Sequence, residues 1–364
     1  MSRSLAGTAS IEALRTVTSS FEGAEERQGQ IDMAYAIAET LAAGRSIIVQ
    51  AGTGTGKSLG YLVPALLNGK KTVVATATKA LQDQLNRNDL PLLSKHLGLD
   101  FSWAVIKGRN NYVCRQRINE LSETAGQLEF EEVSGPTKRE IETIVKWAGK
   151  TRTGDFEELA KVPSERARIA VSVSSDECPG KQKCPVGHDC FAEKARDAAA
   201  AADVIVVNLH IYGLHIASGG SLLPEHEVVI FDEAHQLESV MSDTVGVQLA
   251  AGRFTSLASA VRKVIADPTV TSALETQGVR LTQALTPMSG QRLSNPMPTS
   301  VTEPLALARI EINAILGALR GITTDNESTQ QKSYRAQTQA TRLAEALDIA
   351  LGTIQGYVAY VEGS

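Results

Sequence analysis

The stretch that decides the fold is AGTGTGKS, residues 51–58. Its glycines at 52, 54 and 56 allow backbone conformations with positive φ, which brings backbone N–H groups close to a bound anion. The preceding run SIIVQ at 46–50 is short, apolar and typical of a buried strand, and an apolar helical segment follows the loop. A strand that leads through a glycine-rich turn into a helix predicts a phosphate-binding loop, because the positive end of the helix also attracts anions.

The positions of this loop have distinct expected roles. Lys57 can reach the β- and γ-phosphates of a nucleotide, and the hydroxyl of Ser58 can bind Mg²⁺. Ala51 occupies the first position, where a small residue is sufficient. We therefore expect nucleotide contacts from Ala51, Gly52, Thr53, Gly54, Thr55, Gly56, Lys57 and Ser58.

A second motif, VVIFDEAH at 228–235, complements the loop. An apolar strand that ends in two carboxylates places Asp232 at the carboxyl edge of a parallel sheet, where the phosphate loop also lies. Asp232 is expected to hold Mg²⁺, and Glu233 to polarise an attacking water as general base. Continuation by Ala234 and His235 strengthens the pattern, so the expected catalytic residues are Lys57, Asp232, Glu233 and His235.

Apolar runs and helical segments alternate along the first half of the chain. This alternation predicts an α/β fold whose parallel sheet is covered on both faces. Strand signals fade between about 110 and 195 and again after about 245. Strands are expected at 46–50, 72–78, 204–208 and 227–235, and helices at 31–43 and 79–88.

The last third of the chain has helical periodicity instead. A Pro- and Ser-rich connector at 286–304 leads into it. Apolar residues then recur at helical spacing in two sets, which predicts two helices with one buried face each. The sets are Leu305, Ala308, Ile312, Ile315 and Leu319, and Leu343, Leu347, Leu351, Ile354 and Val358.

Composition narrows the class of protein. The 364 residues carry 36 Lys and Arg against 41 Asp and Glu, a net charge of −5, so a nucleic-acid partner would need a local basic strip. No run approaches the length of a membrane span and no leader is visible at the start, so we expect a cytoplasmic protein without a membrane partner. In that reducing setting, cysteines are expected to bind a metal or cluster rather than form disulfides.

All four cysteines lie where the strand signals fade: Cys114, Cys178, Cys184 and Cys190. The last three belong to DECPGKQKCPVGHDC at 176–190. Thiolates are soft ligands that suit either zinc or an iron–sulfur cluster. Zinc sites favour closely spaced cysteine pairs, whereas these gaps are wider and the first ligand is remote, so the spacing leaves both open. His188 is a further candidate ligand or a solvated loop histidine.

The combination of AGTGTGKS and DEAH resembles superfamily 2 helicases, and among them the DinG/XPD group of iron–sulfur DNA helicases, nearer to DinG. ERQGQIDMA at 26–34 resembles the family's glutamine motif, which implies adenine contacts from Gln30 and Arg27. VVATATKALQDQL at 73–85 resembles a motif that touches single-stranded DNA, which implies contacts from Thr76, Thr78 and Gln82. KGRNNYVC at 107–114 resembles the lead-in to the first cluster cysteine.

The resemblance implies a cofactor and a division into domains. One distant and three close cysteines between the same two strands imply a 4Fe–4S cluster, with Zn²⁺ as the alternative, beside ATP and Mg²⁺. The implied fold is a RecA-like parallel sheet with an inserted cluster domain and a helical arch-like insertion. The implied boundaries are 1–109 and 196–245 for the first motor domain, 110–195 for the cluster domain and 246–364 for the helical part.

Basic residues cluster near the cysteines in sequence. Lys181 and Lys183 alternate with them, and if these cations share a face they form a strip suited to a DNA backbone. The alternative is an ordinary solvated face. Tyr112 could stack on a base or pack within the domain. The other cations are Lys107, Arg109, Arg115, Arg117, Lys194 and Arg196.

The function implied by the resemblance is ATP-dependent DNA unwinding, 5′ to 3′ on single-stranded or forked DNA, in repair or replication. We find no Ser-Ala-Thr motif and no late arginine motif, so we expect the chain to lack the second motor domain and not to unwind DNA alone. Two alternatives stay open. One is a non-catalytic P-loop chain that binds DNA through a cluster or zinc module, and the other is a different P-loop enzyme with a structural zinc.

Overall fold

The computed structural model of the chain describes residues 4–20, 25–52, 54–124, 135–175, 177–324, 326–352 and 358–362. Thr53, an expected nucleotide contact, and Ile354, an expected helical residue, lie outside these ranges. The chain folds into two compact units. Unit 1 comprises Met1–Lys107 and Lys194–Val245, and unit 2 comprises Gly108–Glu193 and Gly246–Ser364.

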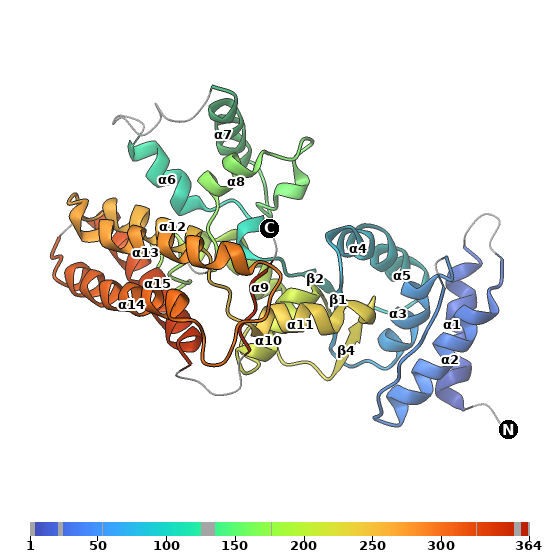
Figure 1. The fold of residues 1–364 in the computed structure, drawn as a ribbon. Coiled ribbons are helices and arrows are strands. Elements are labelled where there is room, and N and C mark those ends of the chain that lie inside the picture. The colour runs from blue at the N-terminus through green and yellow to red at the C-terminus, as the bar shows by residue number, and fades with distance from the viewer. Residues whose placement is uncertain are drawn as a thin grey trace. The chain divides into compact units, whose positions relative to one another are not determined.

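Unit 1 is built on a four-stranded parallel sheet, which confirms the α/β fold class (Figure 1). The strand order is β2-β3-β1-β4, and β1 pairs with β3 through Thr72–Val204 to Thr76–Asn208. The strand β2 was not expected from the sequence, because it is only three residues long. All three of its residues are partly buried. The strands are β1 (Thr72–Thr76), β2 (Trp103–Val105), β3 (Val204–Asn208) and β4 (Val228–Phe231).

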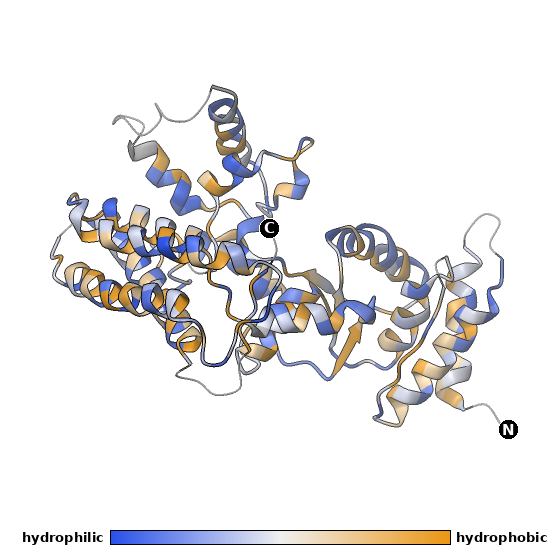
Figure 2. Ribbon diagram, viewed as in Figure 1, coloured by the Kyte–Doolittle hydropathy of each residue, from blue (hydrophilic) through white to orange (hydrophobic). Residues whose placement is uncertain are grey.

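Helices cover both faces of this sheet. Alternate residues of one strand point to opposite faces, so Val74 lies in one hydrophobic core while Val73 and Ala75 lie in the other. Figure 2 shows β4 as an apolar strand beside helices of mixed polarity. The first core includes residues of α1 (Leu5–Thr18), α2 (Gln28–Ala42), α3 (Lys57–Leu67), the π-helical turn Leu85–Asp89 and α5 (Leu90–His96); the second includes residues of α9 (Phe191–Ala201), α10 (Leu209–Ala217) and α11 (Leu237–Val245).

The expected strand at 46–50 is not formed. Residues 45–50 have no regular secondary structure, and the side chain of Ile48 is 96% exposed. A strand exists only where a neighbour supplies hydrogen bonds to its backbone, and this run pairs with none of the described strands. The prediction of a strand at 46–50 was therefore wrong, because an apolar run does not form a strand without a pairing neighbour.

Unit 2 contains the cysteine-bearing segment and a helical bundle. The bundle helices pack around one core that includes Phe254, Leu274 and Ile312, and no helix among the described residues is long and apolar enough to cross a membrane. The expected face from Leu305 to Leu319 is buried in this core. The helices of unit 2 are α6 (Arg115–Thr124), α7 (Gly135–Ala148) and α8 (Glu165–Val171), then α12 (Ala251–Arg262), α13 (Thr269–Leu285), α14 (Thr299–Arg320) and α15 (Glu327–Ala350) (Figure 1).

The expectation that the last helix extends to Val358 was wrong. Helix α15 ends at Ala350, and Gly352 adopts φ +79°, a left-handed conformation that commonly ends helices. The chain at 358–361 is extended instead, and the N–H of Leu293 donates to the carbonyl of Ala359 at 2.9 Å. The connector is also shorter than expected, because α14 already begins at Thr299.

Candidate functional site

The phosphate loop leads directly into helix α3. Gly54 and Gly56 both have φ +77°, and Gly56 is the residue that precedes the helix. The amide of Gln30 donates to the carbonyl of Gly56 at 2.8 Å, and the guanidinium of Arg27 donates to the carbonyl of Gly54. Gln30 lies on α2 (Gln28–Ala42) and Arg27 directly precedes this helix. These two expected adenine-binding residues thus contact the backbone of the phosphate loop.

Replacing Gly56 with alanine should weaken both the fold and nucleotide binding. A Cβ at this position would stand 2.3 Å from Nε2 of Gln30, in a left-handed conformation that costs an L-residue about 1–2 kcal/mol. We expect the free energy of unfolding to fall by at least that amount, measured by denaturant titration. Gly52→Ala is the matched control for stability, since a Cβ there meets nothing within 4 Å. Equal stability of the two variants would contradict this account of the loop.

The two expected motifs meet in space. The ammonium of Lys57, the first residue of α3, lies 2.7 Å from Oε1 of Glu233, which follows strand β4. Asp232 is anchored differently, because its backbone N–H donates to the carbonyl of Ala75 at 2.9 Å and its side chain is buried. His235 is exposed, with Nδ1 3.4 Å from Oε2 of Glu233.

The two neighbouring carboxylates are in different electrostatic environments. Burial raises the pKa of Asp232, and the nearby charge of Glu233 adds to that rise. The hydrogen bond from Lys57 lowers the pKa of Glu233, and the same bond raises the pKa of Lys57. The Lys57–Glu233 pair is therefore ionised at neutral pH. Opposite shifts in adjacent acids are typical of sites where each has its own role.

Tyr61 and Asp89 belong to this site but were not among the expected residues. The hydroxyl of Tyr61 donates to Oδ2 of Asp232 at 3.2 Å, and Tyr61 lies one helical turn after Lys57. That i, i+4 spacing was a signal that could have identified it. Asp89 comes from the π-helical turn; burial raises its pKa, and a hydrogen bond from Gln84 and one with Ser58 act against that rise. No sequence motif marks Asp89.

The three expected DNA contacts on and after β1 have different surroundings. Thr76 is fully buried, and its hydroxyl lies 3.2 Å from the carbonyl of Thr78. Thr78 is exposed, and its hydroxyl accepts the N–H of Leu81 at the start of α4 (Lys79–Gln84). Gln82 is 1% exposed, and its Nε2 has no hydrogen-bond partner among the described residues. Only Thr78 of the three is accessible from outside.

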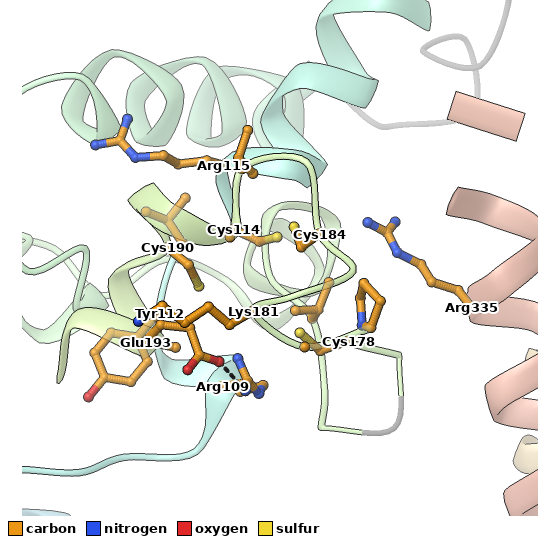
Figure 3. Close-up of a pocket in the computed structure, with 17 residues that line it drawn as sticks. Arg109, Tyr112, Cys114, Arg115, Cys178, Lys181, Cys184, Cys190, Glu193 and Arg335 are labelled. Carbon is orange, nitrogen blue, oxygen red and sulfur yellow. Dashed lines mark hydrogen bonds and ion pairs between the residues drawn. The ribbon is translucent and has the colours of Figure 1, made fainter. Parts of the chain in front are cut away.

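The four cysteines of unit 2 line a single cavity (Figure 3). All four are free and partly buried. Burial raises the pKa of the Cys114 thiol to about 11. Burial also raises the pKa of Cys184, and the nearby Cys178 and Cys190 raise it further. No group of three or more His, Cys, Asp or Glu side chains meets metal-site geometry within the described ranges, so the support for a ligand is the shared cavity alone. His188 is exposed and is not among the lining residues.

Tight backbone turns bring these cysteines together although Cys114 is distant in sequence. The N–H of Cys114 donates to the carbonyl of Val171 at 2.8 Å, and residue 171 lies shortly before the segment 178–190 that carries the other three cysteines. Gly187 permits a close approach, because a Cβ there would stand 2.0 Å from the carbonyl oxygen of Lys181. One main-chain hydrogen bond thus ties the Cys114 segment to residue 171, and the close approach at Gly187 folds the loop that carries the other three cysteines.

Most of the cations near the cysteines are engaged within the protein. Arg109 pairs with Glu193, Arg115 lies 2.9 Å from Asp189, and Lys107 lies 3.4 Å from Asp83. Arg117 lies 3.7 Å from Glu177. The ammonium of Lys183 donates to the hydroxyl of Tyr334 at 2.8 Å. Tyr112 is 5% exposed and lines the cavity, so it packs within the unit, whereas Lys181 lines the cavity and is exposed.

A parallel sheet at which a phosphate loop meets a DEAH motif is the arrangement typical of helicase domains. The DEAD/DEAH box helicase family matches residues 32–129 of this chain.

The curated relatives of this chain include helicases named DinG and YoaA. The chain is 35% identical over 292 residues to the ATP-dependent helicase DinG of Mycobacterium tuberculosis, covering 76% of this chain and 44% of that protein. It is 39% identical to the ATP-dependent DNA helicase YoaA of Escherichia coli over 65% of this chain and 37% of that protein. YoaA of Haemophilus influenzae is 37% identical over 66% of this chain and 38% of its own length. The chain is similar to DinG-type helicases over 65–76% of its own length, and it spans less than half the length of these relatives.

Proposed function

We propose that this chain is the nucleotide-binding part of an ATP-dependent DNA helicase of DinG type. The observation that carries the proposal is the 2.7 Å contact between Lys57 of the phosphate loop and Glu233 of the DEAH motif. This contact joins the group that binds phosphate to the group that activates water. Similarity to relatives that are named ATP-dependent DNA helicases supports DNA as the partner.

The ion pair indicates how nucleotide would engage the site. Each of the two side chains is less than one-third exposed, and each neutralises the other. An incoming triphosphate would compete with Glu233 for the ammonium of Lys57, because both are anions. Lys57 would then contact phosphate, and the released carboxylate of Glu233 would be available as general base. Asp232 and Ser58 are the residues that would hold Mg²⁺, which supplies charge neutralisation at the phosphates.

The variant Glu233→Gln should separate binding from hydrolysis. It removes the general base and also the anion that pairs with Lys57, so ATP affinity should be retained or increased while hydrolysis falls by about 10²–10⁴-fold. Nucleotide binding and DNA-stimulated ATP hydrolysis would be measured side by side, together with strand separation. Glu238→Gln, an exposed residue of α11, is the matched control. Undiminished DNA-stimulated hydrolysis in Glu233→Gln would reject the assigned role.

We propose further that the four-cysteine cavity holds a 4Fe–4S cluster. Support comes from the donor set, since four soft thiols share one cavity. The cysteines Cys114, Cys178, Cys184 and Cys190 would be its ligands, and the cluster would stabilise residues 110–195 as a cluster domain, next to an arch-like domain at 246–364. A single zinc ion is the outcome that would replace it.

The DNA substrate and direction follow from the family resemblance. We propose single-stranded or forked DNA as substrate, movement from 5′ to 3′, and a cytoplasmic site of action in repair or replication. Partial duplexes with only a 5′ or only a 3′ single-stranded tail test the direction, because unwinding of the 3′-tailed duplex alone would reverse it. The second candidate is a non-catalytic chain that binds DNA. DNA binding without ATP hydrolysis by the full protein would favour it.

A further inference from the structure

Arg335 is a buried cation of the bundle helix α15 that lines the four-cysteine cavity. It is only 7% exposed, and it belongs to the same unit as the cysteines. Figure 3 shows its side chain extending from the helix toward Cys184. A buried guanidinium is always charged and requires anionic or hydrogen-bonding partners, so its partners show what this position is built for.

Glu120 of α6 satisfies only part of this requirement. NH1 of Arg335 donates to Oε2 of Glu120 at 2.8 Å, and both side chains are less than 10% exposed. Glu120 also accepts a hydrogen bond from Gln116 at 3.2 Å. The Nε of Arg335 is buried and has no hydrogen-bond partner among the described residues. One donor of the guanidinium therefore remains available beside the cavity.

The neighbours of Arg335 on α15 contact the cysteine loop as well. The amide of Gln331 donates to the carbonyl of Lys183 at 3.0 Å, and the ammonium of Lys183 lies 4.6 Å from the ring centroid of Tyr334. Tyr334 and Arg335 lie one helical turn after Gln331, at i+3 and i+4, so all three are near the same face of α15. The first half of α15 is thus attached to the segment that carries Cys178, Cys184 and Cys190.

We propose that Arg335 is a positioning residue for the group held by the four cysteines, and that it couples this group to the helical bundle. The inference rests on the proposed cluster. A group bound by four thiolates is anionic, and a buried guanidinium beside it compensates that charge and can donate a hydrogen bond to sulfur. The cluster then fixes the position of α15. Loss of the cluster leaves Arg335 facing an empty cavity, with Glu120 as its one carboxylate partner among the described residues.

A simpler role is that Arg335 only neutralises buried Glu120. The double variant Glu120→Gln, Arg335→Gln distinguishes the two, because it removes both charges and leaves no unpaired buried carboxylate. If the pair is only structural, this double variant should behave like wild type. If Arg335 acts on the cluster, the cluster defect of Arg335→Gln should persist in the double variant.

The experiment uses the anaerobically purified full protein and reads the cluster directly. In Arg335→Gln we expect a more negative midpoint potential, because a nearby positive charge favours the reduced cluster. We also expect cluster loss to an iron chelator to be roughly tenfold faster. Arg335→Lys keeps the charge and should restore the potential. Arg309→Gln is the matched control. Arg309 of α14 lies 2.8 Å from Asp348 of α15, so it also forms an ion pair with a bundle helix, but it does not line the cavity.

The outcomes separate this inference from the cofactor assignment. A wild-type protein without iron and sulfide would overturn the cluster and the role of Arg335 together. A wild-type protein with a cluster whose potential and loss rate are unchanged in Arg335→Gln would overturn the role of Arg335 alone. Return of both quantities to wild type in the double variant would also overturn it, in favour of a structural ion pair.

Discussion

The variant Lys57→Ala is expected to lose nucleotide binding and DNA-stimulated ATP hydrolysis. Lys57 is the only side chain that the structure shows bridging the phosphate loop and the DEAH motif within the described residues, through its 2.7 Å contact with Glu233. Removal of one preorganised charge from a site of this kind lowers turnover by on the order of 10²–10³-fold. Binding would be measured by calorimetry and hydrolysis by phosphate release at saturating DNA.

The control for this variant is Lys95→Ala, an exposed lysine of α5. It removes the same charge from the same unit but not from the site. The fold should survive in Lys57→Ala. Glu233 loses its partner in this variant, but its carboxylate is partly exposed and can be hydrated by water. ATP hydrolysis in Lys57→Ala at the level of Lys95→Ala would disprove the assignment of the phosphate loop.

The variant Cys184→Ser is expected to lose most of its cluster. Cys184 lines the cavity together with the other three cysteines, and its N–H is held by the carbonyl of Gly180 at 3.1 Å. Wild type should contain about four iron atoms and matching sulfide, with absorbance at about 400 nm, and the variant should lose most of both. Because a bound metal group contributes to folding, residues 110–195 should also become more sensitive to protease.

His188→Ala is the matched control in the same loop, since His188 is exposed and does not line the cavity. It should keep the iron, the sulfide and the protease resistance of wild type. A colourless wild-type protein with one zinc ion would establish zinc instead of the cluster. Full iron content in Cys184→Ser would show that Cys184 is not a ligand.

The sequence predicted the sheet best where residues are buried on both sides. Residues 204–208 form β3 as expected, because four of its five residues are buried and the apolar run is continuous. The run at 46–50 is also rich in Ile and Val but lacks a described neighbour, and composition does not show whether a neighbouring strand is present. The end of α15 was missed for a related reason, since Val358 fits the helical period but Gly352 ends the helix earlier.

The site was predictable where chemistry depends on local sequence. The DEAH motif follows strand β4 and the phosphate loop leads into α3, and Lys57 and Glu233 meet although the strand expected before the loop is not formed. Arg335 could not be found in this way. It lies far from every cysteine along the chain, and a single arginine on an amphipathic helix carries no signal until the packing of α15 on the cysteine loop is known.

The backbone conformation of Glu233 lowers the stability of the fold at a position that is proposed to serve hydrolysis. Glu233 is the one non-glycine residue among those described that has a positive φ, +57°, and such a conformation is held only because its surroundings impose it. The turn directs Asp232 into the protein, where Tyr61 reaches it, and directs Glu233 toward Lys57. Glycine or asparagine would relax this backbone, but neither can accept a proton from water. Under the general-base role proposed for Glu233, selection for a more stable fold and selection for hydrolysis favour different residues at this position.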